Sequence, residues 1–315
     1  MALVRVQVPA STTNLGPGFD ALGVALRLYN RVELDELPWG ISIQVEGEGK
    51  NTIPRDESNI CVEAVKRVYE RAGRPFRGLW MKQRNHIPLA RGLGSSSAAL
   101  VGGLVGANLM LGGPLTMDGL VQLAVEMEGH PDNVVPALLG GFCISAIDTA
   151  GRAVYTRAPV VDRYLWVIVV PSFEVSTKAA RQKLPRQIPL ADAIFNVQRV
   201  SMLLAAFSTG RDDLFRDAME DRLHQPYRAG LMGPLEEVFA AARKAGALGV
   251  CISGAGPCVL AICAHNPGRV GNAMREVYLA RGIGCRMHVL RMDPRGAHAA
   301  DIAMAEGAPR LLRKG

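Results

Sequence analysis

A glycine- and serine-rich segment in the first third of the chain has the composition of a phosphate-binding loop. Residues 88–99 read Pro-Leu-Ala-Arg-Gly-Leu-Gly-Ser-Ser-Ser-Ala-Ala. Gly92 and Gly94 let the backbone turn tightly and approach a ligand closely. The serines open a predicted helix, where free N–H groups and the helix dipole attract anions. Because this serine loop has no Gly-Lys-Ser/Thr sequence, a Walker P-loop is excluded.

Two further glycine-rich loops lie near the ends of the chain. Residues 9–20 read Pro-Ala-Ser-Thr-Thr-Asn-Leu-Gly-Pro-Gly-Phe-Asp, and residues 253–257 read Ser-Gly-Ala-Gly-Pro. In the first loop, Asn14 and Asp20 could bind a small polar ligand or could close a turn on their own backbone. The second loop could be a plain hairpin turn or could line an anion site with its N–H groups. Neither loop decides between these alternatives by itself.

Acidic residues follow the serine loop at residues 126–133, which read Glu-Met-Glu-Gly-His-Pro-Asp-Asn. Magnesium prefers carboxylate oxygens and keeps several waters. Glu126, at a predicted helix end, could hold this ion together with a hydroxyl of the serine loop. A solvated helix end is the alternative for Glu126 and Glu128, and a surface or capped histidine is the alternative for His130. A zinc site would need more His or Cys at ligand spacing.

Arginines near two later loops could bind an anionic substrate. Residues 176–181 read Ser-Thr-Lys-Ala-Ala-Arg, and residues 222–228 read Arg-Leu-His-Gln-Pro-Tyr-Arg. Arginine binds a carboxylate through two parallel hydrogen bonds, so a pair of arginines would suit a substrate that carries one. A single arginine on a solvated face is the ordinary alternative.

The elements that position these residues are predicted from periodicity and from turn residues. Ala10–Gly18 is expected to be a loop, and Ser58 is expected to cap a helix that ends at Gly73. The expected strands cover residues 3–9, 22–36, 41–46, 81–86, 141–147, 165–170, 250–252, 258–263 and 285–290. Further helices are expected from the serine loop to Leu111, after Thr116, and over residues 192–209, 214–223, 234–245 and 267–281.

Strands that occur in hairpins rather than in regular βαβ units predict an α+β fold with two domains, residues 1–158 and 159–315. The second domain is expected to end in a loosely held tail from about residue 293.

The composition limits the classes of ligand that the protein is expected to bind and the cell compartment in which it is expected. The 315 residues are 49% hydrophobic and carry a net charge of +7, but Lys and Arg are scattered apart from a short run at residues 310–314. With only 5% aromatic residues, the chain favours an anionic small substrate over nucleic acid. The six cysteines form no CxxC pair and are expected to be reduced core thiols. No signal pattern or membrane-length apolar run is evident, so a cytoplasmic protein without a membrane partner is expected.

Together, the three glycine-rich loops resemble the signatures of the GHMP small-molecule kinases, which include galacto-, homoserine, mevalonate and phosphomevalonate kinases. Residues 9–20, 128–134 with the trailing Gly140-Gly141, and 176–181 are similar to the homoserine kinase branch in particular. The resemblance spans roughly residues 3–290. It implies a domain like the second domain of ribosomal protein S5, followed by a ferredoxin-like domain. It also implies transfer of phosphate from ATP, with Mg²⁺, to the hydroxyl of L-homoserine, and a homodimer.

The resemblance assigns roles by position. Ser96 and Glu126 match magnesium ligands, and Asn59 matches an adenine-side contact. The expected ATP-binding residues are Asn59, Pro88, Leu89, Ala90, Arg91, Gly92, Leu93, Gly94, Ser95, Ser96, Ser97, Ala98, Gly254 and Gly256. The expected substrate-binding residues are Asn14, Asp20, His130, Asn133, Thr177, Arg181 and Arg228. The candidates for a direct part in catalysis are Asp20, Asp132 and Asn133.

Asp132 falls where mevalonate-type relatives carry an acidic candidate base. A homoserine kinase could work without a base, with the proton passing to phosphate. Our hypothesis is that Asp132 is structural and that Asp20 orients the substrate through its amino group. Arg91 departs from the family pattern; it could contact ATP or face solvent, and of these two positions solvent is expected. The alternatives are another GHMP kinase, of mevalonate or sugar type, and a non-catalytic GHMP-fold binding protein.

Overall fold

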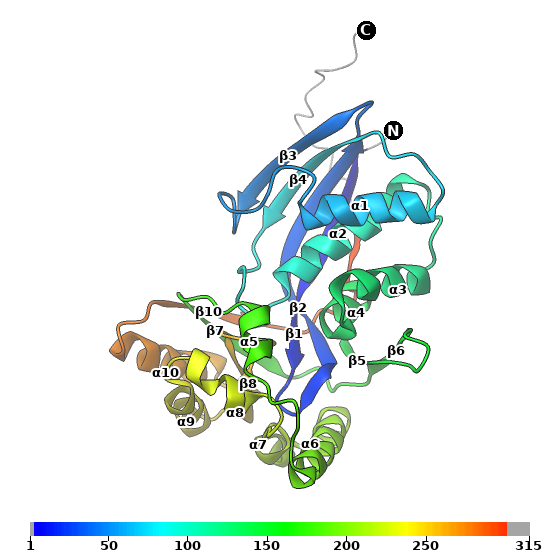
Figure 1. Cartoon of the computed structure of the whole chain (residues 1–315). Helices are drawn as coiled ribbons and strands as arrows, with labels where there is room; N and C mark the ends of the chain where they lie inside the picture. The colour runs from blue at the N-terminus through cyan, green and yellow to red at the C-terminus, as the bar shows by residue number, and fades with distance from the viewer. Residues whose placement is uncertain (1–2, 301–315) are drawn as a thin grey trace.

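The computed structural model describes residues 3–300 and contains two β-sheets. In Figure 1 the first sheet extends from the top of the molecule into its lower half, where the second sheet lies beside it. The first sheet has the order β11-β1-β2-β4-β3, and β5 and β6 extend it from β2. Among the described strands, only β3 and β4 pair in parallel. The strands are β1 (Val4–Asn14), β2 (Gly18–Glu36), β3 (Gly40–Gly47), β4 (Gly78–Asn85), β5 (Phe142–Ile147), β6 (Ala153–Ala158) and β11 (His298–Ala299).

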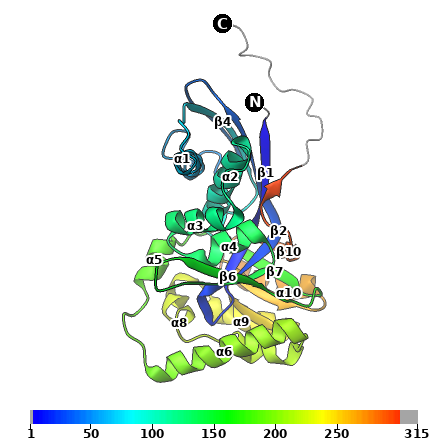
Figure 2. The same cartoon turned by 90° about the vertical axis from the view of Figure 1, so that its right-hand side faces the viewer.

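Helices cover one face of the first sheet, as Figure 2 shows for α1 and α2 beside β1. They are α1 (Ile60–Arg71), α2 (Ser95–Met110), α3 (Met117–Glu128) and α4 (Pro131–Leu139). Helix α2 approaches the sheet closely because it is made largely of small residues. A Cβ on Gly102 would lie 2.7 Å from Val32, and one on Gly106 would lie 2.4 Å from Leu34. This close packing buries α2 and fixes the serine loop at its N-terminus.

The second sheet is antiparallel, with the order β10-β7-β9-β8. Its strands are β7 (Leu165–Pro171), β8 (Gly249–Ile252), β9 (Val259–Cys263) and β10 (Cys285–Leu290). Helices follow the first and the third of these strands, which is the ferredoxin-like arrangement. They are α5 (Thr177–Gln182), α6 (Leu190–Thr209), α7 (Phe215–Ala218), α8 (Gln225–Arg228), α9 (Leu235–Ala245) and α10 (Pro267–Ala280), with 3₁₀ turns at Asp212–Leu214 and Ala229–Leu231. The predicted α+β class is confirmed.

Several local predictions were wrong. Strand β1 continues to Asn14, so only the residues just after it form the turn that was expected to begin at Ala10. Asn59, not Ser58, caps α1 by accepting a hydrogen bond from the Cys61 N–H at 2.9 Å. The expected helix over residues 214–223 ends at Ala218.

Helix α4 was not predicted. Gly129 has φ +87° and ends α3, and Pro131 occupies the first turn of a new helix. The turn between these two helices places residues 128–133 at one point on the molecule.

The chain beyond Leu290 corrects the expected loose tail, because it returns to the first sheet. The Asp293 carboxylate is buried and accepts hydrogen bonds from the Tyr29 hydroxyl at 2.5 Å and from two following backbone N–H groups. Strand β11 then pairs with β1. The segment from Asp293 to β11 is therefore hydrogen-bonded to the first sheet, and β11 is an edge strand of that sheet. The remainder of the predicted tail, residues 301–315, lies outside the described residues.

A continuous core joins the two sheets. Phe207 of α6 packs against Phe142 of β5 at 5.0 Å between ring centroids and stacks on Trp166 of β7 at 5.7 Å. The six cysteines are unpaired thiols, five of them buried, as predicted. Burial raises the pKa of Cys61 to about 12, so that thiol stays protonated near neutral pH.

Candidate active site

The three glycine-rich loops meet at one place in the structure. The Ser11 N–H donates to the Leu93 carbonyl at 3.2 Å, so the first loop binds the serine loop. The Ser253 hydroxyl donates to the Gly92 carbonyl at 2.6 Å, and the Gly254 N–H donates to the Thr13 carbonyl at 3.3 Å. Each loop is therefore hydrogen-bonded to the other two, although they are far apart in the sequence.

Glycine is required at the two points of closest approach. Gly92 and Gly94 have φ values of +77° and +67°, which disfavour a side chain. A Cβ on Gly92 would lie 2.0 Å from the Ser253 carbonyl oxygen, and one on Gly94 would lie 2.1 Å from the Ser11 Oγ. The serine loop owes its shape to these contacts as well as to its own turns.

A cleft of about 330 Å³ opens where the loops meet. Its walls come from β1 and β2 of the first sheet, from the loop between β8 and β9, and from the starts of α2, α4 and α5. The lining residues are Thr13, Asn14, Phe19, Asp20, Pro88, Ala90, Arg91, Gly92, Leu93, Gly94, Ser95, Ser96, Ser97, Glu128, His130, Asp132, Asn133, Thr177, Arg181, Arg228, Gly254 and Ala255. Most of the predicted ATP- and substrate-binding residues are thus brought together.

The N-terminus of α2 faces this cleft. Its N-cap residue, Gly94, has no side chain, and no side-chain hydrogen bond caps the helix. The N–H groups of the first turn, with the dipole of a 16-residue helix, therefore suit the binding of an anion. Three arginines among the lining residues add positive charge.

Glu126, the predicted magnesium ligand, points away from the cleft. Its carboxylate forms ion pairs with Arg67 and with Arg71, the latter at 2.6 Å, on the outer face of α1. Glu128 instead lines the cleft and accepts a hydrogen bond from the Ser97 hydroxyl at 2.7 Å. Residues two apart on a helix point about 200° apart, so only one of these two glutamates can face the serine loop. The structure therefore places Glu128, and not Glu126, beside the serine loop.

Four predicted ATP contacts do not line the cleft: Asn59, Ala98 and Gly256, and Leu89, which lines a neighbouring pocket. Asn59 is 1% exposed, and its amide caps α1 and donates to Pro54 and Gln83, so this side chain has a structural role. A Cβ on Gly256 would meet the Met232 side chain at 2.4 Å, which explains this glycine by packing. Ala98 is buried in α2.

Asn14 closes a turn within the first loop, which was the alternative to ligand binding, and it also contacts the third loop. The Asn14 amide accepts from the Asp20 N–H at 3.0 Å and donates to the Gly254 carbonyl at 2.9 Å. Asp20 has a positive φ of 55°, so its side chain is held at an unusual backbone position. Asn14 therefore orients Asp20 toward the cleft.

Two acid–base pairs lie in the cleft. Arg181 donates two hydrogen bonds to the Asp20 carboxylate, both at 2.9 Å, and these bonds raise the pKa of the guanidinium. His130 and Asp132 share a hydrogen bond of 2.6 Å from Nδ1 to Oδ1. This bond is the main cause of the raised pKa of His130. A carboxylate and cations lying this close together match a ligand that carries both signs of charge.

Arg228 is the most buried cation of the cleft, at 2% exposure. Its Nη1 donates to the Gly254 carbonyl at 3.2 Å. The guanidinium lies over the Phe19 ring at 5.2 Å, and that of Arg181 lies over the same ring at 5.6 Å. Phe19 was missed by the sequence analysis. Its position between Gly18 and Asp20 of the first loop was the available signal.

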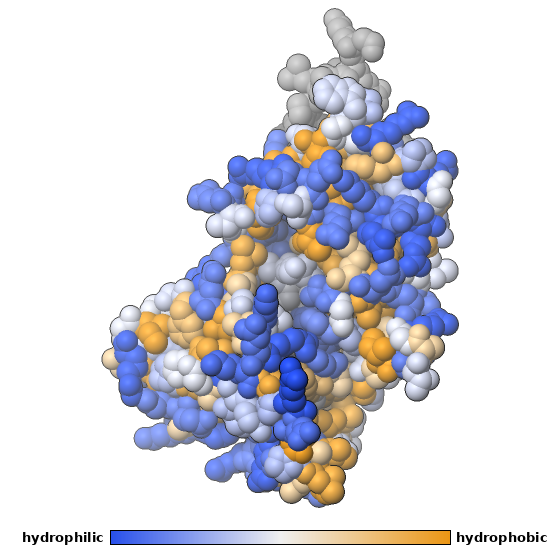
Figure 3. Space-filling view, in the orientation of Figure 1, coloured by the Kyte–Doolittle hydropathy of each residue, from blue (hydrophilic) through white to orange (hydrophobic). Residues whose placement is uncertain are grey.

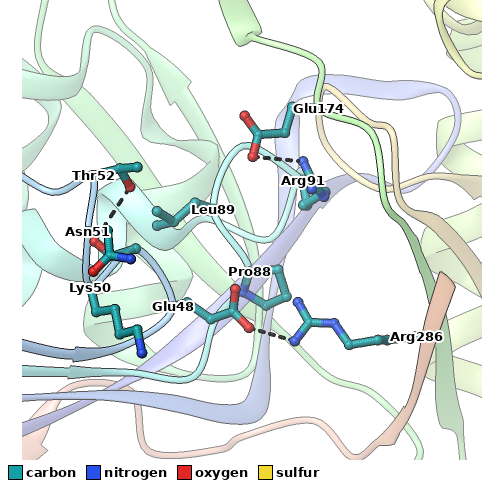
Figure 4. Close-up of a pocket in the computed structure, with 10 residues that line it drawn as sticks. Glu48, Lys50, Asn51, Thr52, Pro88, Leu89, Arg91, Glu174 and Arg286 are labelled. Carbon is teal, nitrogen blue, oxygen red and sulfur yellow. Dashed lines mark hydrogen bonds and ion pairs between the residues drawn. The ribbon is translucent and has the colours of Figure 1, made fainter. Parts of the chain in front are cut away.

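A second pocket, of about 260 Å³, adjoins the cleft and shares Pro88 and Arg91 with it (Figure 4). We call it the outer pocket. Leu89, a predicted ATP contact, lines this pocket rather than the cleft. Arg286 pairs with Glu48 at 2.6 Å across its lower edge. The other residues of the outer pocket are Gly49, Lys50, Asn51, Thr52 and Glu174.

Arg91 does not face solvent as expected. Its side chain is only 13% exposed and pairs with Glu174 at 3.2 Å, while its Nη2 donates to the Ser172 carbonyl at 2.8 Å. Arg91 thus links the serine loop to the segment after β7, between the cleft and the outer pocket.

Comparison with known proteins agrees with this geometry. The family model of the GHMP kinases N-terminal domain matches residues 59–141, and that of the GHMP kinases C-terminal domain matches residues 203–280. The chain is 47% identical over 297 residues to the homoserine kinase of Moorella thermoacetica, covering 94% of this chain and 99% of the relative. The chain belongs to the homoserine kinase branch of the GHMP kinase family. The homoserine kinase of Carboxydothermus hydrogenoformans is 46% identical to this GHMP kinase, covering 94% and 96% of the two chains.

Solved structures support the same assignment. The crystal structure of homoserine kinase from Cytophaga hutchinsonii matches this GHMP kinase with a TM-score of 0.88 and 30% identity, covering 95% and 98% of the two chains. A mevalonate kinase structure matches with a TM-score of 0.68 and 16% identity, which reflects the shared fold alone. The predicted GHMP kinase fold is confirmed.

Proposed function

We propose that this GHMP kinase transfers the γ-phosphoryl group of ATP to the side-chain hydroxyl of L-homoserine, giving O-phospho-L-homoserine and ADP. The homoserine kinase relatives, at 40–47% identity over nearly the whole chain, support this activity. The observation that carries the proposal is a single cleft that joins an anion-binding helix N-terminus to a carboxylate–arginine pair. An α-amino acid and a triphosphate require these two features side by side.

The triphosphate would lie on the serine loop, with the backbone N–H groups of Ser95, Ser96 and Ser97 toward its oxygens. Because this loop has no lysine, the helix N-terminus and a metal ion must neutralise most of the phosphate charge. The nucleoside end would extend into the outer pocket, which continues the cleft past Pro88.

The donor set of the cleft fits magnesium. Mg²⁺ is usually held by one or two carboxylates together with substrate phosphates and waters. Glu128 supplies such a carboxylate, and the hydroxyls of Ser96 and Ser97 supply hard oxygen atoms beside it. The described residues hold no cluster of three or more His, Cys, Asp or Glu. When bound, Mg²⁺ supplies charge neutralisation on the phosphates.

The amino acid would bind by its two charges. Its ammonium group would lie against Asp20, and its carboxylate against Arg181 and Arg228. Asn14, His130, Asn133 and Thr177 supply the remaining polar wall. With both charged groups held, the side-chain hydroxyl would point toward the serine loop. Holding two reactants in this way lowers the entropic part of the barrier.

In the transfer step, the homoserine oxygen bonds to the γ-phosphorus while the bond from that phosphorus to the β–γ bridging oxygen breaks. ADP leaves with the electron pair, and the hydroxyl proton passes to the transferred phosphoryl group. Phosphoryl transfer asks mainly for positioning and for charge stabilisation. We therefore propose that Asp132 positions His130 through their 2.6 Å hydrogen bond and does not act as the base.

The test is a coupled assay of ADP release with L-homoserine, D-homoserine, L-serine, L-threonine and mevalonate as acceptors. We expect turnover with L-homoserine to exceed that with every other acceptor. Mevalonate has a carboxylate but no amino group, so it offers no ammonium group to Asp20. Turnover of mevalonate but not of L-homoserine would refute the proposal.

The homodimer belongs to this proposal, and α6 supplies its surface. Leu190, Ile194 and Val197 lie along one side of this helix and are 76%, 48% and 67% exposed. Small exposed residues continue the stripe at Ser201 and Ala205. A second copy running antiparallel would place its bulky half on this small half, as a two-fold interface requires. Figure 3 shows apolar residues gathered at the end of the molecule where α6 lies.

Helix α6 is also long and apolar enough to cross a membrane by length and composition, with 22% of its most apolar window buried. We propose a cytoplasmic dimer, with neither a membrane nor nucleic acid as partner. Sedimentation should give a dimer for the native protein and a monomer for the double variant Ile194→Asp, Val197→Asp. Capture of the native protein by lipid vesicles, or a monomeric native protein, would contradict this part.

A further inference from the structure

A buried network lies directly behind the cleft, in the segment that joins α7 to α8. The Asp221 carboxylate has no exposed side-chain surface and accepts hydrogen bonds from three consecutive N–H groups, those of Leu223, His224 and Gln225, at 2.8, 3.0 and 2.6 Å. The Asn196 amide donates to the same carboxylate at 2.8 Å. These four bonds fix the backbone from which the His224 side chain projects.

The contacts of His224 define which ring nitrogen carries the proton. Its Nε2 lies 2.7 Å from the Gly16 carbonyl oxygen, which can only accept a hydrogen bond. Nε2 therefore donates, and Nδ1 is left with a lone pair in the neutral ring. The Arg228 Nη1, which can only donate, lies 3.2 Å from this Nδ1. The ring is fully buried, and burial lowers the pKa of His224, which favours the neutral form.

Arg228 is held on one side and open on the other. Its Nη1 donates to two acceptors, the His224 Nδ1 and the Gly254 carbonyl, each at 3.2 Å. Its Nε is buried and has no hydrogen-bond partner among the described residues. Because the guanidinium lines the cleft, the donors that His224 and Gly254 do not use remain for a ligand there.

Phe19 ties this network to the first loop. Its ring stacks on the His224 ring at 5.2 Å between centroids, with an angle of 25° between the planes. The Arg228 guanidinium lies over the same Phe19 ring. The first loop therefore contacts His224 twice, through the Phe19 ring and through the Gly16 carbonyl.

We propose that His224, as the neutral Nε2–H tautomer, is a positioning residue that orients Arg228 toward the substrate carboxylate. This inference rests on the proposed function, because it takes the ligand of Arg228 to be the carboxylate of an α-amino acid. A planar guanidinium with one nitrogen held by two acceptors has its plane fixed. Its other donors then form a preorganised fork for a carboxylate, so that less side-chain entropy is lost on binding.

Two substitutions separate the roles of the two ring nitrogens. His224→Asn keeps an acceptor near the place of Nδ1, whereas His224→Gln keeps a donor near the place of Nε2 and loses the acceptor. Each variant is assayed with L-homoserine and with 3-aminopropan-1-ol, the same amino alcohol without the carboxylate. Where turnover of this analogue is too slow to measure, its inhibition constant against L-homoserine gives the same comparison.

For His224→Gln we expect kcat/KM with L-homoserine to fall at least about tenfold, because KM rises. A loss of this size is expected when a charged hydrogen-bond donor, here Arg228, no longer points at the substrate carboxylate. The value with 3-aminopropan-1-ol and the KM for ATP should stay within about twofold, because neither involves Arg228. His224→Asn should keep most of the preference for the carboxylate. Equal losses with both substrates, or an unchanged ratio in His224→Gln, would overturn the proposal.

A measurement on the native protein covers the case in which the variants do not fold. Long-range ¹H–¹⁵N NMR of protein with ¹⁵N-labelled histidine reports the tautomer of each ring. We expect one ring to be the neutral Nε2–H tautomer near neutral pH, and to be the resonance that is absent from His224→Phe or from any other soluble His224 variant. An Nδ1–H tautomer or an imidazolium at this position would overturn the proposal. If the native enzyme does not phosphorylate L-homoserine at all, the proposed function is wrong, whereas the tautomer of His224 is tested independently by the NMR measurement.

Discussion

The two glutamates near the end of α3 give a direct test of the magnesium assignment. Glu126 and Glu128 lie two residues apart, but only Glu128 lines the cleft. In Glu128→Gln the side chain can still accept the hydrogen bond from Ser97, so the change removes mainly the negative charge. Glu126→Gln makes the same chemical change on the opposite face of the helix and is the matched control.

The two changes differ in expected size. Loss of one preorganised group that faces the transferred charge costs about 3–4 kcal/mol, which corresponds to a rate loss of about 10²–10³-fold. Glu126 is 44% exposed and pairs with Arg67 and Arg71, which are 36% and 53% exposed. Exposed ion pairs contribute about 0.2–1 kcal/mol each, so Glu126→Gln should cost about 2 kcal/mol of stability at most. Its turnover should be unchanged.

The assay is steady-state turnover against magnesium concentration for the native enzyme and for both variants. Glu128→Gln should show a lower kcat/KM for MgATP and should need more magnesium, and its melting temperature should stay near the native value. A fully active Glu128→Gln, or an inactive but folded Glu126→Gln, would refute the assignment.

Three further predictions follow from the cleft. Gly94→Ala should lower both ATP affinity and melting temperature, because the new Cβ causes left-handed backbone strain of about 1–2 kcal/mol and lies 2.1 Å from Ser11. The control is Gly112→Ala, where φ is +81° and no atom lies within 4 Å of the new Cβ, so only stability should fall. Equal turnover in the two variants would contradict the reasoning. Asp132→Asn should lower turnover by about tenfold at most, since positioning effects of this kind are of order 1 kcal/mol, and a loss of several orders of magnitude with the fold and ATP affinity intact would make Asp132 the base. The hydrogen bond from His130 to Asp132 raises the pKa of His130 above 6.5, so its stabilisation is full below about pH 6.5 and is lost as the pH rises through the folded pKa. Urea unfolding should therefore show a larger difference between the native protein and His130→Gln at about pH 5.5 than at about pH 8.5, and the reverse order would contradict the assigned pair.

Most elements and the three loops could be predicted from sequence, because hydrophobic periodicity and glycine positions are local features of the chain. Contacts between distant segments could not be predicted in this way. The choice between Glu126 and Glu128 depends on the rotation of α3 against α1, which composition does not record. In the structure, ion pairs with Arg67 and Arg71 hold Glu126 outside the cleft.

The roles of Arg91 and Asn59 were missed for the same reason. Arg91 was expected in solvent, but its partner Glu174 lies 83 positions along the chain, across the boundary between the two sheets. Asn59 was expected to contact ATP because its position matches the family pattern, but in the structure its side-chain amide caps α1. The contact of residues 293–300 with the first sheet includes a hydrogen bond from Tyr29 to Asp293, and the sequence of the tail does not indicate this distant partner.

The most direct test of the account is the identity of the phosphorylated product. Enzyme, MgATP and L-homoserine are incubated together, and ³¹P NMR and mass spectrometry follow the products. We predict O-phospho-L-homoserine and ADP in equal amounts, formed only with magnesium present and not from D-homoserine. ADP and free phosphate without a phosphorylated amino acid, or transfer to mevalonate in place of L-homoserine, would contradict the central claim.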